Sequence, residues 1–153
     1  MKITIYTDGS AKGNPGKGGY GIVLSAGKHY KELYQGFRHT TNNRMELLAV
    51  IVGLESLKRP GYEVLVVSDS KYVVDAVQKG WLFQWEKKNF KGKKNPDLWK
   101  RFLIIYANHN VSFKWVKGHA GHIENEKCDE LAVMASEEPK LLIDKGYEDM
   151  NSN

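Results

Sequence analysis

The most constraining feature of this sequence is the continuous apolar run Val64–Val67, which ends two residues before the acid Asp69. A strand with one solvated face alternates apolar and polar residues, whereas an unbroken run predicts a strand that is buried on both faces. Residues 40–58 before the run and residues 70–85 after it have helical patterns. Helices in these positions connect parallel strands as crossovers. The run therefore predicts a strand inside an α/β domain.

The other segments predict the remaining elements of this domain. Two hairpins make the third strand run parallel to the first, and helical crossovers give the next two strands the same direction. The sequence therefore predicts a mixed sheet in an α/β fold. We expect a strand over residues 2–8, two strands over 19–37 that turn near Ala26-Gly27, a helix over 40–58, a turn and strand over 60–69, a helix over 70–85 that breaks at Gly80, a helix over 96–108, a strand over 111–118 and a helix over 124–138.

The size and composition of the chain predict one globular domain. The 153 residues are enough for one core, and 41% of them are apolar. No apolar run is long enough to span a bilayer, and the N-terminus reaches an acid too early for a signal peptide. The single cysteine, Cys128, is typical of a reducing compartment. We expect a cytoplasmic monomer with a catalytic domain over residues 1–138 and a polar C-terminal tail over residues 139–153.

Positive charge is concentrated in one segment, Lys79–Arg101, within a chain whose formal net charge is +5. Its basic residues are interleaved with aromatic residues, among them Trp81 and Trp85. Two tryptophans four residues apart are also typical of an amphipathic helix that buries them in a core. The lysines of this segment exceed what solubility requires, and basic residues among aromatics favour binding to a phosphodiester backbone.

A glycine-rich stretch, GKGGYG (Gly16–Gly21), matches the dinucleotide-binding pattern G-x-G-x-x-G. That motif must open a helix whose N-terminus faces the pyrophosphate. Here the apolar residues Ile22–Leu24 continue as a strand. We therefore interpret the stretch as a hairpin that allows close backbone approach, rather than as a nucleotide-binding loop.

Four acids and a histidine are expected at one edge of the sheet, where open α/β sheets place their functional sites. Four carboxylates at one edge repel one another unless a cation neutralises them. Oxygen ligands without sulfur suit Mg²⁺ or Mn²⁺ better than zinc. These residues follow or flank the carboxyl ends of the parallel strands, and they are Asp8, Glu46, Asp69, His119 and Asp129.

Each of the four acids also has a purely structural interpretation. Asp8 could cap a turn, and Asp69 could be the N-cap of the helix that begins near residue 71. Glu46 could complete a capping box opened by Asn43. Asp129 could be an exposed helix acid that pairs with a lysine. Taken singly these interpretations are as good as the functional ones, but together they leave the grouping of four acids unexplained.

The segment that contains His119 offers a second metal hypothesis. His119, His122 and Cys128 are zinc-ligand types, but their spacing fits no common zinc pattern and a fourth ligand is not evident. His119 could be an ordinary loop residue. Its place beside the acidic edge favours a role in proton transfer.

Five motifs together resemble the bacterial type 1 ribonuclease H family, over Ile3 to Ala135. They occur in the family's order and spacing. That family has a five-stranded mixed sheet of order 3-2-1-4-5 flanked by helices, in agreement with the topology inferred above. The motifs are YTDGSAKGNPGKGGYG, TTNNRMEL, SDSKYV, KNPDLW and WVKGHAGHIENEKCDELA.

The resemblance implies an endonuclease that hydrolyses the RNA strand of an RNA–DNA hybrid and leaves 5′-phosphate and 3′-hydroxyl ends. It implies two Mg²⁺ ions, with Mn²⁺ as a substitute. These ions would be held by Asp8, Glu46, Asp69 and Asp129, with His119 relaying protons or aiding product release. The substrate-binding residues that the resemblance implies are Gly9, Ser10, Asn14, Thr41, Asn42, Asn43, Trp81, Lys87, Lys88 and Asn95.

Two alternatives remain open at this point. One is another metal-dependent nuclease or integrase-like enzyme on the same fold. The other is a catalytically inactive module that only binds hybrid, and the intact set of four carboxylates argues against it.

Overall fold

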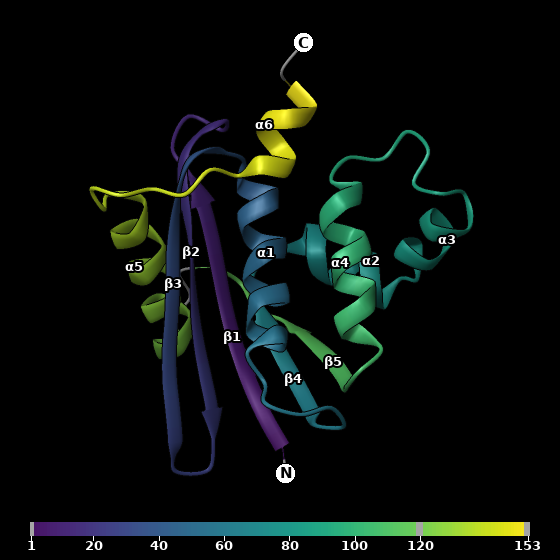
Figure 1. Ribbon diagram of the computed structural model, residues 1–153. Helices are drawn as coiled ribbons and strands as arrows, with labels where there is room; N and C mark the ends of the chain where they lie inside the picture. The colour runs from purple at the N-terminus through teal and green to yellow at the C-terminus, as the bar shows by residue number, and fades with distance from the viewer. Residues whose placement is uncertain (1, 119–120, 152–153) are drawn as a thin grey trace.

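The computed structural model describes residues 2–118 and 121–151, which form a five-stranded sheet with helices on both faces (Figure 1). The strand order is β3-β2-β1-β4-β5, as the family resemblance implied. The strands are β1 (Lys2–Ala11), β2 (Gly16–Ala26), β3 (His29–Thr40), β4 (Glu63–Ser68) and β5 (Asn110–Trp115). The helices are α1 (Asn42–Glu55), α2 (Lys71–Gln78), α3 (Trp81–Lys87), α4 (Pro96–Tyr106), α5 (Ile123–Ser136) and α6 (Lys145–Asn151).

The strand directions confirm the predicted mixed sheet. β2 is antiparallel to both β1 and β3, while β4 is parallel to both β1 and β5. The expected break at Gly80 is present, because this glycine has a left-handed backbone (φ 75°) and separates α2 from α3. The carboxyl ends of β1, β4 and β5 therefore lie at the same edge of the sheet.

Strand β1 is longer than the sequence pattern predicted. It does not end at Asp8 but continues to Ala11, because β2 is long enough to pair with it from Ser25 to Gly18. Asp8 pairs with Gly21 inside this ladder. The glycine stretch is accordingly the start of β2, which confirms the hairpin interpretation.

Helix α5 covers the face of the sheet opposite α1 (Figure 1), and glycines on β2 and β3 allow it to approach closely. A Cβ atom on Gly21 would collide with the carbonyl oxygen of Cys128, and one on Gly36 would collide with that of Ala135. Asp129 follows Cys128 directly, and Gly21 is the β-sheet partner of Asp8. The close approach at Gly21 therefore brings Asp129 towards Asp8.

Helix α1 packs between the sheet and α4, and nine of its residues are buried. Its core side chains include Leu47, Ile51 and Leu54, which have no exposed surface. This burial fixes the position of Glu46 relative to β1. Among the described residues, no helix is long and apolar enough to cross a membrane.

The segment predicted as a polar tail contacts the sheet. Leu142 forms a β-bridge with Phe37, with its N–H donating to the Gly36 carbonyl (3.0 Å) and its carbonyl accepting from the Arg38 N–H (2.9 Å). Helix α6, which the sequence analysis did not predict, then follows. The division of the chain at residue 138 stays a prediction.

Candidate active site

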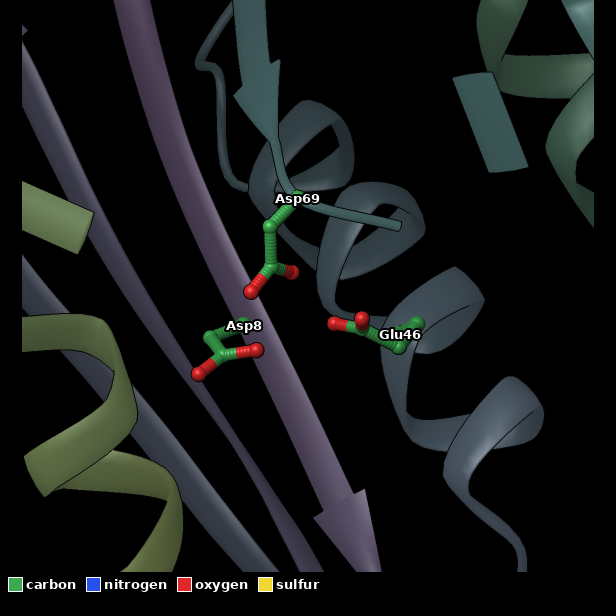
Figure 2. Close-up of side chains that lie close together, drawn as sticks. All are labelled: Asp8, Glu46 and Asp69. Carbon is green, nitrogen blue, oxygen red and sulfur yellow. The ribbon is translucent and has the colours of Figure 1, made fainter. Parts of the chain in front are cut away.

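Three of the predicted carboxylates meet at the carboxyl edge of the sheet. Asp8 comes from β1, Glu46 from α1 and Asp69 from the residue after β4. Figure 2 shows the three side chains converging on one point. Each offers an oxygen, and these oxygens lie within 4.8 Å of one another. This spacing suits shared binding of a divalent cation.

The contact between β1 and α1 is made through Gly9. Its N–H donates to Asp8 Oδ1 (2.9 Å) and to Glu46 Oε1 (2.7 Å). A Cβ atom on Gly9 would collide with the backbone of Met45 and Glu46, so only glycine permits this approach. Gly9 is buried and Ser10 is half-buried.

The capping interpretations of Glu46 and Asp69 are wrong. The N-cap of α1 is Thr41, whose hydroxyl accepts from the Arg44 N–H (3.3 Å), so Asn43 opens no capping box. The first turn of α1 contains no acid, and Glu46 is the fifth residue of the helix rather than the third, which the capping box required. The N-cap of α2 is Ser70, not Asp69.

The carboxylate of Asp69 is incompletely satisfied. Its Oδ1 is buried and has no hydrogen-bond partner among the described residues. Trp115 Nε1 donates to the Asp69 backbone carbonyl (3.0 Å), which fixes the main chain at this point. A buried carboxylate oxygen without a donor costs free energy, and a cation would satisfy it.

Asp129 lies beside this cluster rather than within it. It lines a small pocket with Asp8 and Asp69, but it is not one of the three acids whose oxygens are mutually close. His119 lies outside the described residues. The remaining lining residues, which the sequence analysis did not assign to the metal site, are Lys117, His122, Asn125 and Glu126. Their nearness to His119 and Asp129 in the sequence was the signal that could have identified them.

Burial and mutual repulsion dominate the electrostatics of the cluster. Burial, followed by the charges of Asp69 and Asp129, raises the pKa of Asp8 to about 8. Burial and the charges of Asp8 and Asp69 also hold the pKa of Glu46 well above its ordinary range. A bound divalent cation would remove this cost, since it favours the ionised form of each carboxylate. The residues therefore fit a divalent metal centre.

This arrangement predicts how Asp8→Asn changes the stability of the metal-free protein. A carboxyl group with a raised pKa in the folded state destabilises the fold as the pH rises. The effect grows between the unfolded-state pKa of 3.8 and the folded-state pKa of about 8. At pH 9 we expect Asp8→Asn to melt at least about 4 °C above the wild type in EDTA. At pH 5, closer to the unfolded-state pKa, the difference should be clearly smaller. Equal differences at both pH values, measured by thermal denaturation, would contradict the assigned repulsion.

The zinc hypothesis finds no support in the described residues. Cys128 lies on the buried face of α5 and packs with Val23 and Leu131. Burial raises the pKa of its thiol far above the ordinary value, which disfavours the thiolate that zinc requires. Within the described part of the chain, the clustered candidate ligands are carboxylates alone.

Four of the predicted substrate-binding residues line one cavity of about 510 Å³, next to the N-terminal ends of α1 and α4. The loop between β1 and β2 joins this wall, because Asn14 Oδ1 accepts from the Asn42 N–H (2.9 Å). Asn42 Oδ1 accepts from the Ala11 N–H in turn. The predicted residues in the cavity are Asn14, Thr41, Asn43 and Asn95, and the others are Pro15, Lys93, Lys94, Pro96, Tyr147 and Met150.

A second cavity of about 340 Å³ extends this surface towards α3. It includes Trp81, which is 43% exposed, and it shares Lys93 and Lys94 with the first cavity. The predicted residues Lys87 and Lys88 are exposed but line neither cavity. The two cavities meet at Lys93 and Lys94, which give this surface positive charge.

Comparisons with known proteins agree with this fold and site. The RNase H family model matches residues 1–137. The chain is 55% identical over 148 residues to the ribonuclease H of Desulforamulus reducens, covering 94% of this chain and 92% of that protein. It is 53% identical over 152 residues to the ribonuclease H of Trichodesmium erythraeum, covering 96% of each.

Solved structures show the same architecture. LC9-RNase H1, described as a type 1 RNase H with the type 2 active-site motif, has a TM-score of 0.82 and 30% identity, covering 99% of this chain and 81% of that one. LC11-RNase H1, solved in complex with an RNA/DNA hybrid, has a TM-score of 0.66 and 28% identity, covering 95% and 99%. The fold, the cluster of acids and these matches define an endoribonuclease. The chain belongs to the RNase H family.

Proposed function

We propose that this protein hydrolyses the RNA strand of RNA–DNA hybrids with two divalent cations, leaving 5′-phosphate and 3′-hydroxyl ends. The convergence of Asp8, Glu46 and Asp69 at one sheet edge is the observation that carries the proposal. High identity to ribonucleases H over almost the whole chain supports it. The hybrid bound in the LC11-RNase H1 structure supports the choice of substrate.

The four acids hold the cations in this proposal. Asp8 is central, because it belongs to the cluster with Glu46 and Asp69 and also lines the small pocket with Asp129, and it would contribute to both ions. Glu46 and Asp69 would hold one ion, the one that assists the leaving group, and Asp129 would hold the other. When bound, such a pair of ions activates water and stabilises the leaving 3′-oxygen. Carboxylate oxygens favour Mg²⁺, with Mn²⁺ as a substitute.

Substrate choice depends on groups beside the acids. RNA differs from DNA by its 2′-hydroxyl, which both donates and accepts hydrogen bonds. We propose that the backbone of Gly9 and Ser10 approaches the RNA strand. Asn14, Asn42 and Asn43 would then contact the hybrid near its minor groove. Thr41 and Asn95 would hold a phosphate of the DNA strand.

A cleavage assay with four end-labelled substrates tests this function. The substrates are the RNA–DNA hybrid, single-stranded RNA, duplex RNA and duplex DNA, each with Mg²⁺ or with EDTA. We expect cleavage of the RNA strand of the hybrid alone, and only with Mg²⁺. Cleavage of duplex DNA would indicate a different nuclease, and binding of hybrid without cleavage would indicate an inactive binding module.

The basic segment Lys79–Arg101 predicts a specific kinetic effect. Replacing four of its lysines with alanine should raise KM far more than it lowers kcat, because phosphate contacts distant from the scissile bond act equally on ground and transition states. The salt dependence of hybrid binding should also flatten. The lysines to replace are Lys87, Lys88, Lys93 and Lys94.

A charge-matched control separates this effect from a loss of net charge. Four other lysines lie at the start of β1, at the β2–β3 turn and after the end of α1, away from the carboxylates. Their replacement should leave KM nearly unchanged. Equal effects of both sets would mean that only net charge matters. The control residues are Lys2, Lys28, Lys31 and Lys58.

We propose that His119 acts in proton transfer or product release. His119→Ala should then slow turnover without abolishing it, since a general acid–base group contributes about 10²–10⁴-fold. A slower single-turnover rate would assign it to proton transfer. A lower steady-state rate alone would assign it to release. Wild-type rates in both regimes would remove His119 from the site.

We further propose that the protein is a cytoplasmic monomer whose catalytic domain spans residues 1–138. The single cysteine supports a reducing compartment. The match of the family model to residues 1–137 supports the extent of the domain. Sedimentation analysis with and without hybrid would test the monomeric state.

A further inference from the structure

We propose that the C-terminal segment, residues 141–150, is part of the substrate-binding site, and that Asp144 is a positioning residue for the cavity containing Thr41 and Asn95. This inference rests on the proposed function. It assigns a role to the segment that sequence composition predicted to be a polar tail. It is carried by a chain of buried hydrogen bonds that leads from Asp144 to both of these cavity residues.

The centre of this chain is Arg44 on α1, whose side chain is 1% exposed. Its guanidinium donates to Asp144 from Nε (2.7 Å) and Nη2 (2.8 Å). It also donates to Asp97 on α4, from Nη1 (2.9 Å) and Nη2 (2.7 Å). Such paired, charge-assisted hydrogen bonds fix geometry as well as neutralise charge. Arg44 therefore holds α1, α4 and the C-terminal segment in one arrangement.

Asn95 is held by this arrangement. Its Oδ1 accepts from Arg44 Nη1 (3.3 Å), and its Nδ2 donates to the Tyr72 hydroxyl (3.1 Å). Both ends of the amide are thus engaged by protein. Asn95 has a left-handed backbone (φ 62°) immediately before Pro96, the first residue of α4. Asparagine adopts this conformation more readily than most residues, and its side-chain contacts hold Asn95 in place at the cavity wall.

Thr41 is connected to Asp144 as well. The hydroxyl of Thr40, the residue before it, donates to Asp144 Oδ2 (2.7 Å). The Thr41 hydroxyl accepts from the backbone N–H of Arg44 (3.3 Å). The side-chain carboxylate of Asp144 therefore supports both the Thr41 side and the Asn95 side of the cavity.

Helix α6 supplies part of the cavity wall directly, through Tyr147 and Met150. Figure 1 shows α6 beyond the start of α1, at the end of the sheet where β1 ends. The centroids of the Tyr147 and His39 rings lie 5.5 Å apart. The Arg44 guanidinium lies 5.9 Å from the centroid of the Tyr147 ring. The helix is therefore packed against the same arginine that orients Asn95.

Loss of the Asp144 carboxylate should weaken hybrid binding more than it slows the cleavage step. Glu46 keeps its own hydrogen bond from the Gly9 N–H, and Asp8 and Asp69 lie on other elements. The carboxylate cluster is thus anchored independently of Asp144. A structural role alone would instead lower the fraction of folded enzyme, which reduces apparent kcat and leaves KM unchanged.

The test compares Asp144→Asn with wild type, well below the melting temperature of each protein. We expect KM for hybrid to rise about tenfold, the typical scale for a hydrogen bond to a charged group, with kcat within about twofold. The Kd for hybrid in Ca²⁺ should rise in parallel. Glu55→Gln is the control, because Glu55 pairs with Arg101 across α1 and α4 away from the cavity (2.6 Å). It should retain wild-type KM.

A second variant keeps the proposal testable if Asp144→Asn does not fold. Thr40→Val removes one hydrogen bond to Asp144 and keeps the Arg44 pair, and it should raise KM to a smaller extent. An unchanged KM in a folded Asp144→Asn, or in Thr40→Val when Asp144→Asn does not fold, would overturn this inference alone, provided that the wild type cleaves hybrid. Failure of the wild type to cleave hybrid would instead overturn the proposed function.

Discussion

Asp8→Asn is expected to lower kcat for hybrid cleavage by at least about a thousandfold while leaving the fold intact. Bound metal contributes several kcal/mol of transition-state stabilisation, and Asp8 is the acid that interacts with all three of its carboxylate neighbours. The substitution changes charge without adding bulk. Far-UV circular dichroism, melting temperature and turnover in Mg²⁺ measure the two effects separately.

Asp75→Asn provides the matched control for this loss. Asp75 lies on α2 and pairs only loosely with Lys79 on the surface (3.6 Å), away from the carboxylate cluster. Its replacement removes the same charge and should leave turnover near the wild-type value. Near-normal turnover in Asp8→Asn would contradict the metal-centre assignment.

Arg44→Met is expected to have the largest effect on stability, lowering the free energy of unfolding by about 3–5 kcal/mol. The reason is that Asp144, which is 5% exposed, would keep a buried charge without its cationic partner. Asp97 would lose the same partner. Urea denaturation of the metal-free protein, followed by circular dichroism, gives the difference directly.

Arg101→Met is the comparison for this prediction. Arg101 forms an equally short ion pair with Glu55, but both side chains are partly exposed. Exposed pairs contribute only about 0–1 kcal/mol, so the loss should be small. If the two substitutions cost the same, burial of Arg44 is not what makes its ion pairs important.

The sequence predicts most of the fold because its elements carry local signals. The apolar run Val64–Val67 identifies the inner strand β4, and Gly80 and Pro96 mark helix ends. The extension of β1 beyond Asp8 has no such signal, because pairing with β2 decides where the strand ends. Helix α6 is also missed, since it has only seven residues, most of them polar, and it is held by tertiary contacts.

The site shows the same division between local and long-range information. Asp8 and Asp69 are predictable because each follows an apolar stretch of a strand, and the connections fix the direction of both strands. The positions of the N-caps are not, since Thr41 and Ser70 compete with neighbouring polar residues that cap equally well in isolation. The Arg44–Asp144 pair spans 100 residues of sequence, and no local pattern distinguishes Asp144 from a solvated acid.

The central claim is that Asp8, Glu46, Asp69 and Asp129 hold the two cations that cleave the RNA strand. Its most direct test is an anomalous difference map of crystals grown with Mn²⁺ and a hybrid that cannot be cleaved. We predict two peaks about 4 Å apart, bounded by the four carboxylates and joined by Asp8. Ions bound elsewhere, or no peak beside Asp8, would contradict the claim.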